Sequence, residues 1–262
     1  MVRTRHLTLE EWFNELQLRY ASREFTHLPG MIDIDVTALV KAAEDTGQRF
    51  SPTAVLIKAA ALLLQSRPRL NRMLFHTLGG MRIAEFDEIR VNLPVLVASG
   101  DEQVLTAMVL HHLEDKSVPV IQKEIRAFCA SGLADKPVAR FVATRGNYWW
   151  NRFALRILHF FATRFPSLYA REGGGISVTS LIRRNVPGAI LRGAPLGQTA
   201  FTLAVSSFHP QPDGSYLLSV GVDYNHSVLG GDEASEALSQ LSLILMSADT
   251  ESFYPSVVSD QH

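Results

Sequence analysis

The stretch Tyr216–Asp232, YLLSVGVDYNHSVLGGD, runs from a strand into a tight turn and places a histidine where the two meet. The part up to Tyr224 is rich enough in apolar and β-branched side chains to predict a strand. Gly230 and Gly231 break that pattern, and the following residues return to a helical period. His226 is therefore held at a strand end, where a neutral imidazole suits general-base chemistry because its ordinary pKa of about 6.5 lies near neutral pH. A hydrogen-bonded turn histidine is the alternative interpretation.

The composition sets limits on the class of protein. The chain has 262 residues, of which 47% are hydrophobic and 19% charged, enough for one large domain with a substantial core. A formal net charge of −1 gives no electrostatic reason to expect nucleic acid or an anionic membrane as partner. The single cysteine, Cys129, excludes an internal disulfide and a cysteine-rich metal site, and we expect no metal. Without an apolar leader or a membrane-spanning run, the sequence predicts a cytoplasmic protein.

Helical and strand patterns alternate along the chain. Thr8 and Glu11 form a capping box that predicts a helix through EEWFNELQLRYA. Ser51-Pro52 opens a long apolar helix, TAVLIKAAALLLQS, which we expect in the core. Further expected elements are strands at 31–37, MLFHTL, EIRVNLPVLVA and QVLTAMVL, and helices in ALVKAAEDTG and at 118–130. No repeat or linker interrupts the pattern, so one α/β domain over residues 1–262 is the expectation.

An aromatic helical segment, YWWNRFALRILHFFATRF, occupies Tyr148–Phe165 within an expected insertion at about 140–170. Its polar residues recur at helical spacing and leave a broad apolar stripe, made of Trp149, Trp150, Phe153, Ile157, Phe160 and Phe161. We expect this stripe to pack against the core or a neighbouring subunit. A wall or lid for an apolar substrate is an alternative. A helix lying on a membrane, with arginines toward the headgroups, is another alternative and is less favoured.

A glycine triplet, Gly173–Gly175, precedes an alternating strand at Ile176–Leu181. The hydroxyls of Ser177 and Thr179 share one face of that strand. Hydroxyls on a rigid strand can donate to an oxyanion, although they are equally common as ordinary polar residues of a strand. The triplet lacks the lysine and following helix of a phosphate-binding loop, which excludes that motif.

Together these segments resemble the catalytic domain of the 2-oxo acid dehydrogenase acyltransferases, the dihydrolipoyl acyltransferase family, with chloramphenicol acetyltransferase as a more distant relative of the same fold. The matching segments are IDIDVTALVK (32–41), FSPTAVLIKAAALLLQSRPRLN (50–71), VNLPVLVASGDEQVLTAMVL (91–110), GGGISVTSL (173–181) and YNHSVLGGDEASEAL (224–238). The resemblance implies a chloramphenicol acetyltransferase-like α/β fold, a two-layer sandwich in which a mixed sheet packs with helices.

The resemblance also implies roles for individual residues. His226 corresponds to the family histidine that removes a proton from the attacking group, and Thr179 to the hydroxyl that stabilises the oxyanion. We expect Ser177, Ser180 and Asn225, which flank these two, to contact the substrate. The family implies coenzyme A thioester as a co-substrate rather than a permanently bound cofactor. It also implies a homotrimer whose sites lie between subunits.

The histidine motif departs from the family pattern at three positions. Asn225, Ser227 and Gly230 stand where the family has aspartate, arginine and a second aspartate. The favoured hypothesis is an acyltransferase that moves an acyl group from coenzyme A, or from an acyl carrier protein, to a small hydroxyl, amine or thiol acceptor. A catalytically inactive trimeric scaffold is the alternative that Gly230 supports most. A thioester hydrolase or condensing enzyme of the same fold is another. Asp232 is the sequence's candidate to replace the missing carboxylate.

Overall fold

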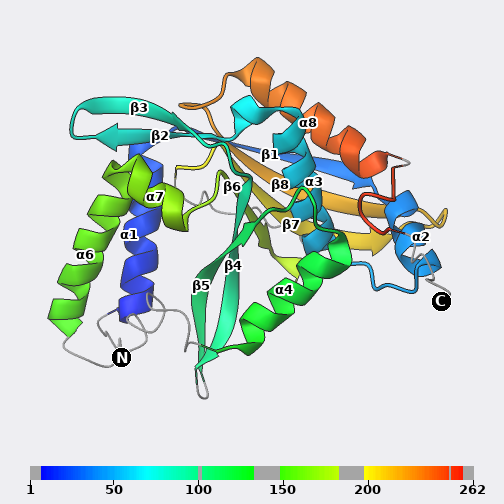
Figure 1. The fold of residues 1–262 in the computed structure, drawn as a ribbon, viewed down its shortest axis with the longest axis horizontal. Helices are drawn as coiled ribbons and strands as arrows, with labels where there is room; N and C mark the ends of the chain where they lie inside the picture. Colours follow the sequence, from blue (N-terminus) through cyan, green and yellow to red (C-terminus); the bar gives the residue numbers. More distant parts are fainter. Residues whose placement is uncertain (1–6, 100–101, 133–147, 183–197, 248, 256–262) are drawn as a thin grey trace, which may run out of the picture.

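A six-stranded mixed sheet forms the centre of the molecule (Figure 1). The computed structural model describes residues 7–99, 102–132, 148–182, 198–247 and 249–255. Across the sheet the strands are β1 (His27–Asp35), β8 (Tyr216–Asn225), β7 (Phe201–Pro210), β6 (Ile176–Ser180), β4 (Arg90–Ser99) and β5 (Glu102–His111). β6 runs parallel to β4 and β7, and the other pairs are antiparallel. This arrangement confirms the predicted α/β class with a mixed sheet.

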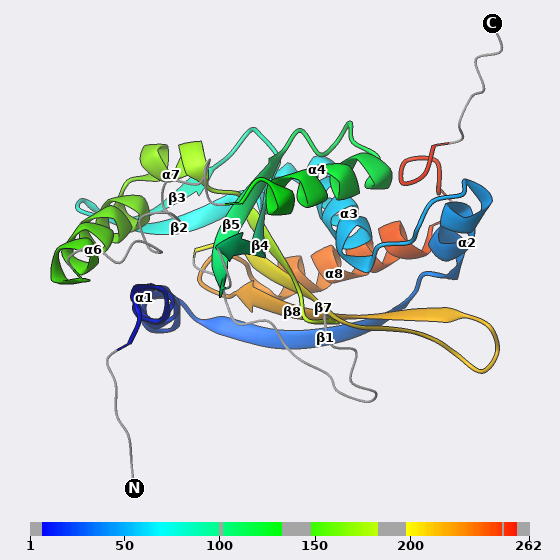
Figure 2. The same ribbon diagram turned by 90° about the horizontal axis from the view of Figure 1, so that it is seen from below.

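Helices cover one side of this sheet. Figure 2 shows α3, α4 and α8 on one side of β1, β8 and β7. The described helices are α1 (Leu9–Glu24), α2 (Thr37–Asp45), α3 (Pro52–Ser66), α4 (Val118–Ala130), α6 (Tyr148–Arg164), α7 (Pro166–Glu172) and α8 (Gly231–Met246), with a short 3₁₀ turn, η1 (Pro68–Leu70). A separate hairpin, β2 (Arg72–Thr77) and β3 (Gly80–Glu85), lies beside α7 and α6.

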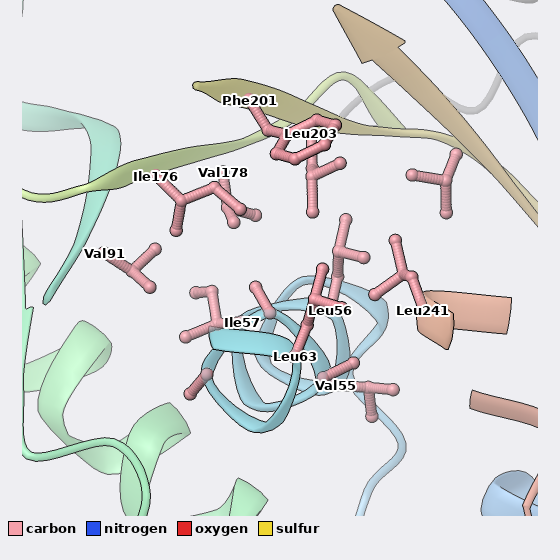
Figure 3. Packing of buried hydrophobic residues seen from close by; sticks show 14 of the residues in the cluster. Val55, Leu56, Ile57, Leu63, Val91, Ile176, Val178, Phe201, Leu203 and Leu241 are labelled. Atoms are coloured by element: carbon pink, nitrogen blue, oxygen red, sulfur yellow. The ribbon is translucent and has the colours of Figure 1, made fainter. Parts of the chain in front are cut away.

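The core is built around α3. Ser51 caps this helix by accepting a hydrogen bond from the Ala54 N–H, and Pro52 occupies its first turn, where a missing N–H is harmless. Leu56 and Ile57 point toward the strand residues Ile176, Val178, Leu203 and Phe201 (Figure 3). Fully buried apolar side chains of this size each stabilise the fold by about 1.5–3 kcal/mol. The long apolar helix is therefore in the core, as predicted.

A second, small apolar cluster joins α1 to α6. Leu9 and Trp12 of α1 pack against Leu155 of α6, apart from the main core. The capping box of α1 is present, with Thr8 and Glu11 each bonded to the other's backbone N–H. These two helices thus form a unit at the edge of the sheet, visible at one end of the molecule in Figures 1 and 2.

Four described elements were not predicted from the sequence, namely η1, β3, α7 and β7. β1 also begins at His27 rather than at Met31, because its first residues pair with β8 despite the Pro-Gly step at 29–30. The described residues Tyr148–Arg164 of the predicted aromatic segment are helical, and the earlier part of the expected insertion lies outside the described residues.

Candidate active site

His226 is fixed by its backbone at the point where β8 ends. Its N–H donates to the Thr26 carbonyl oxygen at 2.7 Å, and the preceding N–H of Asn225 donates to Ala200 at 3.0 Å. Thr26 precedes β1 and Ala200 precedes β7, and these are the two strands that flank β8. The end of β8 is therefore held from both neighbouring strands. The side chain itself is exposed. This is the combination that the sequence predicts, a rigid backbone with a reachable imidazole.

The imidazole of His226 is oriented by the turn that follows it. Its Nδ1 lies 3.2 Å from the carbonyl oxygen of Leu229. A carbonyl oxygen can only accept a hydrogen bond, so Nδ1 carries the proton when this bond is made. The neutral ring then has its lone pair on Nε2, which is the arrangement a general base requires.

Asn225 forms the hydrogen bonds that define the turn around His226. Its carbonyl oxygen accepts from the N–H groups of Val228 and Leu229 at 2.9 and 3.0 Å, and its Oδ1 accepts from the Ser227 N–H at 3.0 Å. The side chain is fully buried, and its Nδ2 has no hydrogen-bond partner among the described residues. These contacts give Asn225 a role in shaping the turn, while its expected contact with substrate stays a prediction.

Glu233, which the sequence reasoning missed, brings a carboxylate to the turn. Its Oε2 accepts from the Gly230 N–H at 3.2 Å and lies 2.7 Å from Nη2 of Arg72 in β2. Gly230 stands where the family motif has its second aspartate, and Asp232, the sequence's candidate replacement, is exposed in the first turn of α8. The signal was available: Glu233 lies three residues after the helix N-cap, the spacing at which a glutamate reaches back to the cap.

A histidine–aspartate pair lies beside the turn, on the β1 side. His27 Nδ1 is 2.6 Å from Asp223 Oδ1, and both side chains are about nine-tenths buried. His27 is directly opposite Asn225 in the β1–β8 register. The pair thus ties the edge strand β1 to the strand end that holds His226.

The predicted hydroxyl residues lie on β6, two strands away. Ile176 and Val178 enter the core, so the alternation of the strand turns Ser177 and Thr179 to the opposite face of the sheet. Ser177 is buried and its Oγ has no partner among the described residues, while Thr179 is half-buried. Ser180, also half-buried, follows the alternation to the core side. These three residues therefore do not share one face.

The glycine triplet allows β6 to lie close to its neighbours. A Cβ on Gly174 would come within 2.7 Å of the Arg90 carbonyl oxygen, and a Cβ on Gly175 within 1.8 Å of Asn71 Oδ1. Both distances are too short for a real side chain. The absence of side chains at Gly174 and Gly175 lets the start of β6, the strand that carries Thr179, lie against Arg90 and Asn71.

The register of the sheet separates His226 from Thr179 within one chain. Thr179 is opposite Ala204 of β7, which is opposite Gly221 of β8. From Gly221 to His226 the chain advances by about 16 Å at the rise of a β-strand, and the two strand spacings add about 10 Å sideways. One reacting carbonyl group therefore cannot contact both side chains of the same subunit.

Comparison with solved structures shows the fold. The probable dihydrolipoamide acetyltransferase of Listeria monocytogenes 4b F2365 superposes with a TM-score of 0.65 at 18% identity, covering 95% of this chain and 97% of that one. The cubic core of the pyruvate dehydrogenase multienzyme complex gives 0.64 at 19% identity, over 96% and 93% of the two chains. A chloramphenicol acetyltransferase gives 0.50 at 13% identity, over 92% and 96%.

No family model and no curated protein matches the sequence. The chain nevertheless has the fold of the dihydrolipoamide acetyltransferase cores and of chloramphenicol acetyltransferase, as the sequence resemblance predicts.

Proposed function

We propose that the protein is an acyltransferase that moves an acyl group from a thioester, of coenzyme A or of an acyl carrier protein, to a small hydroxyl, amine or thiol acceptor. The observation that carries the proposal is the hydrogen bond between His226 Nδ1 and the Leu229 carbonyl, because it leaves an exposed Nε2 lone pair at a fixed strand end. The shared fold supports it, since the matched structures include a probable dihydrolipoamide acetyltransferase and a chloramphenicol acetyltransferase.

The proposed reaction uses two groups of the protein. His226 Nε2 takes the proton of the acceptor as its oxygen, nitrogen or sulfur attacks the thioester carbonyl carbon. The Thr179 hydroxyl donates to the oxygen that becomes negative in the tetrahedral intermediate. When the intermediate collapses, the carbon–sulfur bond breaks, and the leaving thiolate takes the proton from the His226 imidazolium. The acylated acceptor and a free thiol are the products.

The separation of His226 from Thr179 within one chain supports a site that lies between subunits. Each site would take its histidine from one subunit and its hydroxyl from the next, around a closed trimer. The matched cubic core is an assembly of such chains, which supports an oligomer here. We propose a homotrimer on this basis.

A mixing experiment tests the site and its location together. His226→Ala and Thr179→Val subunits, carrying different tags, are co-expressed, and mixed oligomers are purified by both tags. Each variant alone should lose activity, His226→Ala by roughly 10²–10⁴ and Thr179→Val by roughly 10²–10³. Every trimer that carries both tags combines, at one of its three sites, a native histidine with a native threonine from the neighbour, so about a third of the activity should return.

If both residues act within one chain, no mixed oligomer recovers activity, because every chain lacks one of them. Full turnover of thioester by His226→Ala alone would remove the general-base assignment. Thiol release is measured with a panel of acyl-coenzyme A thioesters, with and without hydroxyl, amine and thiol acceptors. Release that needs no acceptor would identify a hydrolase in place of a transferase.

An inactive scaffold is the second candidate, because Ser227 and Gly230 replace the charged residues of the family motif. Native mass spectrometry against the same thioesters separates the two. A scaffold assembles and retains no thioester, whereas an acyltransferase with a coenzyme A donor retains one class of acyl chain.

A further inference from the structure

Helix α6 exposes its apolar side to solvent. Exposed fractions of 41–68% are found for the whole aromatic stripe, which consists of Trp149, Trp150, Phe153, Ile157, Phe160 and Phe161. At 100° per residue these side chains fall within one third of the helix circumference. The expectation that this stripe packs against the core of the chain is therefore wrong for the described residues.

The opposite side of α6 contacts α1 and carries the polar residues. Asn151 and Thr163 are buried there, and the Arg152 guanidinium lies 4.7 Å from the Trp12 ring centre. The His159 ring packs edge-on against Phe13 and Tyr20 of α1, at 6.4 and 5.2 Å between centres. The helix thus places its polar side against the protein and its aromatic side outward, the reverse of an ordinary surface helix.

The charge on α6 has one sign. Its sequence contains Arg152, Arg156 and Arg164 and no aspartate or glutamate. In the part of the chain that the structure describes, none of these arginines forms an ion pair with a carboxylate. Arg156 is exposed beside Trp12, and Arg164 donates to the His76 carbonyl. Among the described residues, the stripe is therefore bordered by arginine charge that has no carboxylate partner.

The position of α6 leaves its outer side accessible. The helix lies at the far end of the molecule in both views, with α1 on its inner side (Figures 1 and 2). The neighbouring hairpin and α7 add exposed apolar side chains at Leu78, Met81 and Leu168. An apolar patch of this extent marks an interaction surface, since soluble proteins rarely expose contiguous aromatic side chains.

We propose that the aromatic side of α6 is a docking surface for an anionic lipid membrane. The helix would lie in the plane of the membrane, with tryptophan and phenylalanine at the headgroup–acyl boundary and the flanking arginines near lipid phosphates. Its 17 residues span about 25 Å, which suits lying along the surface. None of the described helices is both long enough and apolar enough to cross a bilayer.

The charges favour a membrane over a second copy of the chain. In a twofold contact between two α6 stripes, the exposed Arg156 of each helix would lie at the contact, and neither helix offers a carboxylate in return. Anionic headgroups supply the opposite charge that a second α6 lacks. The stripe shares no residue with the His226 turn, and vesicle binding is measured without acyl transfer, so this proposal can fail or hold independently of the proposed function.

Vesicle co-sedimentation of the full chain tests the proposal. Unilamellar vesicles of phosphatidylcholine alone are compared with vesicles containing equal parts of phosphatidylglycerol, at low and high salt. We expect binding to the anionic vesicles, weakened by salt, and a blue shift of tryptophan emission. The variant Phe153→Glu/Ile157→Glu should bind at least tenfold more weakly. Trp150→Glu is a second, single variant in case the first is unstable.

Leu243→Glu in α8 is the matched control, because Leu243 is 62% exposed and lies on another helix. It should bind anionic vesicles as the unaltered chain does. Circular dichroism and light scattering report folding and subunit number for each variant. Absence of vesicle binding by the unaltered chain overturns the proposal, and so does equal loss in Leu243→Glu. Dissociation of an oligomer by the α6 variants, without any vesicle binding, would identify a second copy as the partner instead.

Discussion

The carbonyl oxygen of Leu229 decides which nitrogen of His226 can accept a proton. The oxygen is held in place because the N–H of the same residue donates to Asn225. The tautomer is thus set by backbone atoms, which a side-chain substitution nearby does not remove. This makes the chemistry of His226 testable by replacing the imidazole alone.

Replacing His226 by glutamine should lower kcat/KM for acyl transfer by roughly 10²–10⁴, because a neutral amide is not a base. The melting temperature should change little, since the side chain is exposed. His209→Gln, at the exposed end of β7, is the control and should keep full activity. Equal rates for the two variants would show that the imidazole of His226 takes no part in the reaction.

Glu233 is a positioning residue in the proposed mechanism, through Gly230 and Arg72. Glu233→Ala should reduce kcat by roughly tenfold with little change in KM, because a loosened turn misplaces Nε2 without touching the substrate. Glu233→Gln keeps the acceptor for the Gly230 N–H and should recover part of the rate. Glu236→Ala removes the exposed pair with Arg67 and should be neutral. Identical kinetics for the two alanine variants would exclude this role.

At the scale of elements, the α1–α6 contact contains a half-buried histidine, His159. Burial lowers the pKa of His159 below its usual value of about 6.5, and the nearby Arg164 charge lowers it further. Below about pH 6.5, His159 is protonated in the unfolded chain but stays neutral in the folded chain until a lower pH. The free energy of unfolding therefore falls as the pH falls. The stability that the neutral His159 ring provides is fully present above that pH and is lost on acidification.

His159→Phe should flatten this dependence. The three tryptophans, Trp12, Trp149 and Trp150, all lie in α1 and α6, so thermal melting followed by tryptophan emission reports this unit. Between about pH 7 and pH 5 the melting temperature of the unaltered chain should fall more steeply than that of the variant. His209→Phe should leave the slope unchanged. Parallel slopes for His159→Phe and the unaltered chain would contradict the assignment.

Local patterns predicted most elements, and long-range contacts explain what they missed. α1 and α3 were predicted because their signals are local. Thr8 and Ser51 cap the two helices, and the helical period of α3 lies within one continuous segment. The outward side of α6 was not, because it depends on Trp12 and Phe13 of α1 accepting polar partners. Likewise the distance from His226 to Thr179 depends on strand register, which no single segment encodes.

At the scale of the whole molecule, residues 249–255 pack against the main core and bind the start of α4. Phe253 is buried in the main cluster, and its carbonyl oxygen accepts from the Val118 N–H at 2.9 Å. Phe253→Ala should therefore destabilise the fold by about 3–5 kcal/mol. Urea denaturation measures the change. Leu243→Ala, at an exposed position, should stay within about 0.5 kcal/mol. Similar losses for both would show that the segment is not part of the cooperative unit.

The pairing of β1 with β8 also determines when the turn that holds His226 can form during synthesis. His27 and Asn225 are direct partners, yet most of the chain lies between them. A chain leaving the ribosome has β1 long before it has β8, and closing so long a loop requires the intervening strands and helices to be in place. The hydrogen bond from the His226 N–H to the Thr26 carbonyl oxygen also forms only once β8 pairs with β1. A nascent chain that stops short of β8 has no partner strand for β1 and no oriented imidazole.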